Sequence, residues 1–109
     1  MNNYTVVNQE TKKVNEGKKS DSGKLRYDLV LPEFEDLIAA ALTFGANTYG
    51  ANTWQNIEDA PERYYAALRR HISAWRKGEK TDSESGLSHL AHAASNLMFL
   101  AYFDKQENA

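Results

Sequence analysis

The segment TDSESGLSHLAHAASNLMFLAYF, residues 81–103, decides the fold of this chain. Residues 85–103 contain no Lys, Arg, Asp or Glu, yet they include His89, His92 and Asn96. The absence of a charged face is typical of a helix that is buried on all sides. We therefore predict that other protein surfaces cover this helix completely. One side of this helix is an apolar stripe of Leu87, Leu90, Ala94, Leu97, Met98 and Ala101. The opposite side carries His89, His92, Asn96, Phe99 and Phe103.

Complete cover of this helix requires more surface than the chain itself offers. The sequence predicts only two other long helices, which leaves part of the last helix without a neighbour. We therefore expect a second copy of the chain to supply the missing surface. The predicted architecture is a small helical bundle completed by homo-oligomerisation.

The polar residues on the opposite side need hydrogen-bond partners, because a buried imidazole or amide without one costs roughly 1–3 kcal/mol. In a purely structural interpretation, Tyr64, Tyr65 or backbone groups of other helices supply those partners. The two histidines and the asparagine follow one another at helical spacing, however, and Asp82 and Glu84 stand at the entrance of the helix. We therefore predict that these residues line a pocket.

Two other helices precede this segment. The first is predicted over residues 31–46, where Pro32 and several acids open a run of apolar residues at helical spacing. The second is predicted over residues 60–77, preceded by Asp59 and Glu62 in the arrangement of a capping box. Together with the last helix, they predict an all-α fold.

The last helix is predicted over residues 84–104, with Asp82 or Ser83 as its N-terminal cap. A loop rich in Gly, Asn and Thr is predicted between the first two helices, anchored by Tyr49 and Trp54. These elements define the surroundings of the predicted pocket.

Length and composition limit the classes of function. The chain has 109 residues, a net charge of −2 and no cysteine. We predict a flexible arm at residues 1–22 and one helical nucleotide-binding domain at residues 23–105. Without a basic field or a long apolar segment, neither a nucleic acid polymer nor a membrane is an expected partner. We expect a cytoplasmic protein whose site uses oxygen and imidazole groups.

Three acids precede the last helix and are candidates for binding a metal ion. Glu79, Asp82 and Glu84 lie within six positions, and carboxylate oxygens suit a hard cation such as Mg²⁺. The alternative is a solubilising loop that contains a helix cap. Spacing alone gives only weak support to the metal site.

Several basic residues are candidates for binding phosphate. Arg70 lies among small residues, so its guanidinium either pairs with an acid or meets a phosphate. His71 lies at the edge of the predicted core, where a structural role and ligand binding both remain open. Lys24 and Arg26 lie beside Gly23 and could clamp a phosphate next to a pocket.

Two long segments resemble a known family. They are GKLRYDLVLPEFEDLIAAALTFGANTYGANTW, residues 23–54, and YYAALRRHISAWRKGEKTDSESGLSHLAHAASNLMFLAYF, residues 64–103. They are similar to the phage dATP/dGTP diphosphohydrolase N-terminal domain family. The most specific motifs comprise Arg70, His71, Gly78, Glu79, Asp82, Glu84, Ser85, Gly86, His89, His92 and Asn96.

The resemblance implies an all-α nucleotide pyrophosphohydrolase related to MazG-type enzymes. Such an enzyme would work as an oligomer with Mg²⁺ or Mn²⁺ and split a purine deoxynucleoside triphosphate into monophosphate and pyrophosphate. Two departures stand out. Asn47 and Thr48 occupy positions where lysines are expected, and the acidic helix motifs of MazG-type enzymes are missing, with His89 and His92 in a comparable stretch.

The resemblance assigns roles to the candidate residues. A metal bound by the three acids, helped by His89 or His92, would activate water, and Arg70 and Lys24 would meet the developing charge. Asn96 would read a base edge or orient an imidazole. The catalytic candidates are Glu79, Asp82, Glu84, His89 and His92, the first three being the metal candidates, and the substrate-binding candidates are Lys24, Arg26, Tyr49, Trp54, Arg70, His71, Trp75 and Asn96, with Tyr64 beside them.

Two other functions remain open. A binding protein of the same fold would sequester a nucleotide or a nucleotide immune signal in the host cytoplasm, act against host defence and need no cofactor. A structural oligomerisation module would bind no nucleotide at all. The sequence favours the enzyme slightly over the binding protein.

Overall fold

The computed structural model describes residues 22–107, which divide into two compact units between Val30 and Leu31. Most of the predicted flexible arm, residues 1–21, lies outside the described residues. The first unit has one short 3-10 helix, η2 (Tyr27–Leu29). In the same unit Arg26 binds Asp28, with 2.8 Å between the guanidinium and carboxylate atoms.

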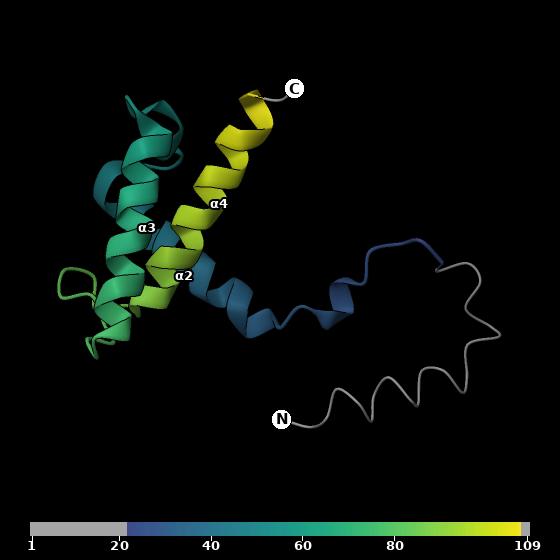
Figure 1. The fold of residues 1–109 in the computed structure, drawn as a ribbon, viewed down its shortest axis with the longest axis horizontal. Coiled ribbons are helices and arrows are strands. Elements are labelled where there is room, and N and C mark those ends of the chain that lie inside the picture. Colours follow the sequence, from purple (N-terminus) through teal and green to yellow (C-terminus); the bar gives the residue numbers. More distant parts are fainter. Residues whose placement is uncertain (1–21, 108–109) are drawn as a thin grey trace. The chain divides into compact units, whose positions relative to one another are not determined.

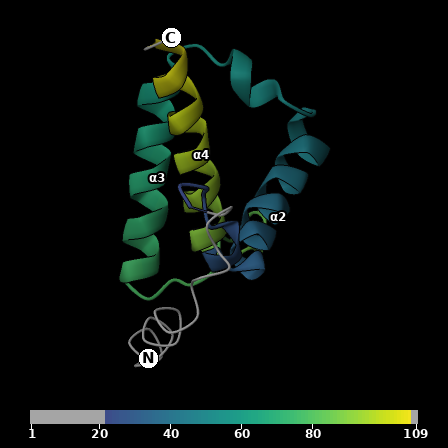
Figure 2. The same cartoon turned by 90° about the vertical axis from the view of Figure 1, so that its right-hand side faces the viewer.

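The second unit contains α2 (Pro32–Tyr49), the 3-10 helix η3 (Thr53–Asn56), α3 (Ala60–Arg76) and α4 (His89–Glu107). Helix α4 packs against both α3 and α2. Figure 1 and Figure 2 show α3 and α4 side by side and antiparallel, with α2 on another side of α4. The predicted all-α fold with three main helices is confirmed.

The core of this unit is built from small and polar side chains. Its buried apolar residues are all alanines, namely Ala41, Ala60, Ala91, Ala93 and Ala94. Alanine lets helix backbones approach closely. Five of the six buried residues on α4 lie between Ala91 and Asn96, and the sixth is His89 in the first turn. His89 and Asn96 are only 4% and 6% exposed, so their predicted burial is confirmed.

The predicted apolar stripe of α4 is only partly right. Leu97 is 58% exposed and Ala101 is also exposed, because α2 and α3 cover other sides of the helix. The N-terminal half of α4 is therefore enclosed within the single chain, whereas its C-terminal half keeps an open side. Homo-oligomerisation, which would cover that side, stays a prediction.

Helix α4 begins at His89, five residues later than predicted. Residues 82–86 form a turn instead, in which the Gly86 amide donates to the Asp82 carbonyl at 2.8 Å. Ser88 provides the cap, since its hydroxyl oxygen accepts a hydrogen bond from the Leu90 amide at 3.0 Å. The prediction that Asp82 or Ser83 caps this helix is therefore wrong.

The other helix ends also differ from the predictions. Asp59 is the N-cap of α3, but its backbone is left-handed (φ 55°) and its side chain makes no capping hydrogen bond, so the predicted capping box is wrong. Helix α2 continues to Tyr49, which was predicted in the loop. None of the helices in residues 22–107 combines the length and apolar character that crossing a membrane demands.

The Ser88 cap can be tested by comparing two serines of the same connection. We expect Ser88→Ala to lower the free energy of unfolding by about 1 kcal/mol, because a first-turn amide loses its acceptor. Ser83→Ala is the matched control and should change it by less than about 0.5 kcal/mol. Urea unfolding followed by circular dichroism measures both, and equal losses would contradict the assignment.

Candidate functional site

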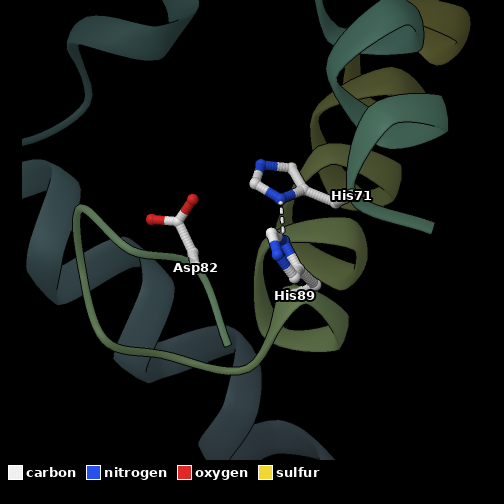
Figure 3. A group of neighbouring side chains, drawn as sticks. All are labelled: His71, Asp82 and His89. Carbon is white, nitrogen blue, oxygen red and sulfur yellow. Dashed lines mark hydrogen bonds between the residues drawn. The ribbon is translucent and has the colours of Figure 1, made fainter. Parts of the chain in front are cut away.

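All three histidines of the chain meet where α3 ends and α4 begins. Nδ1 of His71, on α3, lies 2.8 Å from Nδ1 of His89, on α4, as Figure 3 shows. The ring of His92, one turn farther along α4, stacks on the ring of His71 with centroids 4.8 Å apart. Two helices thus bring three imidazoles into one cluster, which we call the histidine cluster.

The connection from α3 to α4 brings two carboxylates to this cluster. Gly78 follows the C-cap of α3, with a positive φ of 107° that favours glycine. The amide of His89 donates to the Lys80 carbonyl at 2.9 Å, and the amide of Asp82 donates to the Leu87 carbonyl at 2.7 Å. These bonds fix the connection against the first turn of α4.

Glu79 determines the tautomer of His89. Its Oε2 lies 2.7 Å from Nε2 of His89, and an ionised carboxylate can only accept a hydrogen bond. Neutral His89 therefore carries its proton on Nε2, which makes its Nδ1 an acceptor for the proton on Nδ1 of His71. A chain of hydrogen bonds thus runs from His71 through the buried His89 to Glu79.

Asp82 and Ser85 form a second set of contacts. Oδ2 of Asp82 accepts hydrogen bonds from the amide and the hydroxyl of Ser85, at 2.9 and 3.0 Å. The Ser85 hydroxyl also lies 2.6 Å from Nε2 of His92, and the same Asp82 oxygen lies 3.8 Å from that nitrogen. Ser85 therefore connects the carboxylate to the histidine cluster.

The pKa values of His71 and His92 favour neutral imidazoles, and the pKa of Asp82 favours an ionised carboxylate. Burial lowers the pKa of His71, and the neighbouring His92 and His89 lower it further. Burial also lowers the pKa of His92, although Asp82 acts in the opposite sense. Burial alone would raise the pKa of Asp82, but the hydrogen bonds from Ser85 and the nearby histidines outweigh it and lower that pKa.

A cleft of about 1150 Å³ opens beside the histidine cluster, between α2, the segment containing η3, α3 and α4. One part of its wall is aromatic, because Trp54 stacks on Phe99 with centroids 4.4 Å apart and the hydroxyl of Tyr64 donates to the Trp54 carbonyl at 2.8 Å. Another part is polar. It includes Arg63, Arg70, His71, Asp82, Glu84, His92 and Asn96.

The structure gathers most of the candidate residues at this cleft. Its lining includes Tyr49, Trp54, Tyr64, Arg70, His71, Asp82, Glu84, His92 and Asn96. Glu79 and His89 are not part of this lining, but hydrogen bonds connect Glu79 to His89 and His89 to His71. Trp75 instead contacts Lys80, whose ammonium nitrogen lies 4.6 Å from the ring centroid. Lys24 and Arg26 belong to the first unit, residues 22–30.

Sequence reasoning assigned no role to Ser85 or to Phe44. Phe44 of α2 makes an edge contact with His92, with ring centroids 6.2 Å apart. A signal for Ser85 does exist, since an aspartate three residues before it and a glycine after it are typical of a hydrogen-bonded turn. Phe44 carried no such signal, because its contact depends on how α2 packs.

Among residues 22–107, the group of side chains close enough to share one metal ion consists of His71, Asp82 and His89, whose ligand atoms lie within 4.8 Å of one another. Glu79 and Glu84, which the sequence grouped with Asp82, are not in this set. Mg²⁺ favours carboxylate, phosphate and water oxygens over imidazole. A set with two imidazoles and one carboxylate therefore does not fit Mg²⁺.

Comparison with known proteins adds a second line of evidence. Residues 14–109 match the family described as dATP/dGTP diphosphohydrolase, N-terminal. This chain belongs to that family. The chain is also similar to the dATP/dGTP diphosphohydrolase of Salmonella phage PMBT28, with 40% identity over 84 residues.

That similarity covers 77% of this chain but only 28% of the phage protein, so the chain spans about a quarter of its relative's length. No solved structure matches the chain significantly. Family membership confirms the resemblance predicted from residues 23–54 and 64–103. For this chain, the activity of the longer relative is a proposal.

The lowered pKa values of His71 and His92 predict that acid destabilises the fold. At pH values between the pKa of these histidines in the folded chain and their ordinary pKa of about 6.5, the unfolded chain binds more protons than the folded chain does. The stabilising contribution is therefore complete above about pH 6.5 and is lost as the pH falls toward the folded values. Urea unfolding at several pH values between 7.5 and 5 should show this decline.

The non-titrating variant His92→Gln tests the origin of this decline. We expect a shallower loss of stability below pH 6.5 in the variant, because one of the two groups no longer takes up a proton. The same change of slope should not appear in Glu62→Gln, at an exposed acid in the first turn of α3. Equal stability at pH 7.5 and pH 5 in the wild-type chain would refute the expectation.

Proposed function

We propose that this chain binds a purine deoxynucleoside triphosphate in the cleft between α2, α3 and α4 and hydrolyses it to monophosphate and pyrophosphate. The observation that carries the proposal is the cleft itself, whose lining combines aromatic side chains with cationic and imidazole groups. Its volume of about 1150 Å³ is ample for a ligand of this size. Membership of the family and the name of the phage relative support the choice of ligand.

The aromatic wall suits a purine base. Trp54, Tyr64 and Phe99 form one cluster, in which the Tyr64 and Phe99 centroids are 4.7 Å apart. Aromatic surfaces of this kind stabilise a flat base by stacking and by excluding water. Asn96 already donates an amide proton to the His92 carbonyl at 2.8 Å, which holds its side chain in one orientation at the cleft.

The cationic side of the cleft suits the phosphates. Arg63 and Arg70 line it and are both exposed, so neither guanidinium is enclosed by protein before a ligand arrives. A guanidinium offers a planar set of donors that matches phosphate oxygens. Charge that develops on the phosphoryl oxygens would be met by the same groups.

The hydrolytic step requires a water molecule and a proton acceptor. The oxygen of water attacks the α-phosphorus, the bond from that phosphorus to the bridging oxygen breaks, and pyrophosphate leaves with the bonding electrons. Glu84 is the candidate acceptor for the water proton. It lines the cleft, and its side chain makes no hydrogen bond or ion pair with the other residues of 22–107.

A binding-only function is the second candidate, and specific contacts favour it. The carboxylates of Glu79 and Asp82 are already engaged by His89 and Ser85. The similarity to the phage enzyme also covers only 28% of that protein. A chain that sequesters a nucleotide or a nucleotide immune signal would use the same cleft without cleaving its ligand.

Product analysis separates the candidates. The full chain is incubated with each of the four deoxynucleoside triphosphates, with and without Mn²⁺ or Mg²⁺, and the nucleotides are then separated by chromatography. We expect monophosphate and pyrophosphate from dATP or dGTP. Intact ligand recovered after heat denaturation would support sequestration. If the chain neither bound a nucleotide nor formed products, both candidates would be rejected in favour of a structural oligomerisation module.

The phosphate contact is tested by Arg70→Ala. Loss of one charge-assisted contact of about 1.5–3 kcal/mol should weaken binding of the triphosphate by about 10- to 100-fold. Arg76→Ala, at an exposed arginine at the end of the same helix, is the matched control and should bind as the wild type does. Isothermal titration calorimetry measures both variants, and equal affinities would overturn the assignment of Arg70.

A further inference from the structure

Two members of the histidine cluster, His71 and His89, form a candidate metal site together with the adjacent Asp82. Each side chain offers one ligand atom, and the three atoms lie within 4.8 Å of one another. They come from α3, from the connection after it and from the first turn of α4 (Figure 3). Three separate segments of backbone thus hold the three side chains, and hydrogen bonds from His89 to Lys80 and from Asp82 to Leu87 fix the connection.

Glu79 prepares His89 to bind a cation. Metal-binding histidines commonly donate their second ring proton to a carboxylate, which fixes the tautomer and turns the other nitrogen toward the ion. The 2.7 Å contact between Nε2 of His89 and Oε2 of Glu79 is such an arrangement. It leaves a lone pair on Nδ1 of His89, the atom that faces His71 at 2.8 Å. The side chain of His89 is only 5% exposed, so its orientation is fixed.

Asp82 is prepared in a similar way. The amide and hydroxyl of Ser85 both donate to Oδ2 of Asp82, which orients the carboxylate and keeps it ionised. The ring of His92 stacks on the ring of His71 with an interplanar angle of 18°, which restricts the rotation of His71. All three candidate ligands are therefore positioned by neighbours that are not ligands themselves.

We propose that His71, Asp82 and His89 bind one divalent transition-metal ion that accepts imidazole ligands, such as Zn²⁺ or Co²⁺. Two nitrogens and one carboxylate oxygen match the preferences of these ions and leave a coordination position open. His71 and Asp82 also line the cleft, so the open position is accessible to a ligand there. The ion takes the place of the proton between the two imidazoles, and neutral His71 changes tautomer, so that its ring proton moves from Nδ1 to Nε2 by exchange with solvent.

For the two imidazoles only a small movement is required, whereas the Asp82 oxygen, within 4.8 Å of the imidazole ligand atoms, also has to move toward the ion. At a metal–nitrogen distance of about 2.1 Å, two tetrahedral ligands stand about 3.4 Å apart. The two Nδ1 atoms lie 2.8 Å apart, so the rings separate by about 0.6 Å to admit a tetrahedral ion. The proposal does not depend on nucleotide binding, and it can fail or hold separately from the function proposed above.

The test is a titration of the full chain, stripped of metal with a chelator, with Zn²⁺ in a calorimeter and with Co²⁺ in a spectrophotometer. We expect one ion per chain and visible Co²⁺ absorption bands of a protein-bound site. Asp82→Asn and His71→Asn should lose this binding. Glu79→Gln should weaken it by about 10- to 100-fold, because the orienting carboxylate is lost.

Glu84→Gln is the matched control, because Glu84 belongs to the same connection but not to the proposed ligand set. Its metal affinity should equal that of the wild type. Loss of binding in Glu84→Gln with retention in His71→Asn would favour a carboxylate site and overturn the proposal. Absence of Zn²⁺ and Co²⁺ binding by the wild-type chain would also overturn it.

A measurement on the wild-type chain avoids any effect of the substitutions on folding. Zn²⁺ should shift the imidazole ¹⁵N resonances of His71 and His89 more than those of His92 in NMR spectra that correlate ring nitrogens with ring protons. Shifts limited to His92, or no shift in any of the three histidines, would contradict the proposed ligand set.

Discussion

The need to satisfy a buried imidazole governs the arrangement of this chain. His89 is enclosed at the start of α4, and both of its ring nitrogens find partners, one in Glu79 and one in His71. An unpaired nitrogen there would cost roughly 1–3 kcal/mol, a large share of the stability of a small domain. The connection between α3 and α4 has to place a carboxylate beside His89, and α3 has to present His71. The same requirement that orders the fold therefore also assembles the candidate site.

This coupling explains why structure and chemistry are difficult to separate in the histidine cluster. Hydrogen bonds that satisfy buried groups also choose tautomers and orient a carboxylate, while burial favours the neutral imidazoles of His71 and His92. Family membership places a nucleotide enzyme among the chain's relatives, whereas the cleft supplies the local argument for a nucleotide. In the proposed function, the base and the phosphates are bound by side chains such as Trp54 and Arg70, which lie outside the cluster. Ligand recognition and the chemistry of the histidines are thus assigned to different side chains.

Much of this arrangement could be predicted from the sequence. The absence of charge from residues 85–103 predicted the burial of His89 and Asn96, and helical spacing predicted three helices. Helix ends were less predictable, because the cap depends on which serine reaches a free amide, and Ser88 rather than Ser83 does so. The metal candidates were grouped by proximity in the sequence, but ligand sets form in space. His71 is 11 residues before Asp82, and only the packing of α3 on α4 brings them together.

The alanine core reverses the usual ranking of sensitive positions. In most domains the largest buried side chains carry the packing, and truncation creates cavities. In residues 22–107 no large side chain is fully buried, and the buried apolar residues of α4 are alanines such as Ala91 and Ala94. A larger side chain at these positions would clash with its surroundings, so enlargement rather than truncation is the destabilising change. The spacing between α3 and α4, and with it the geometry of the imidazoles, is set by the smallest side chains of the protein.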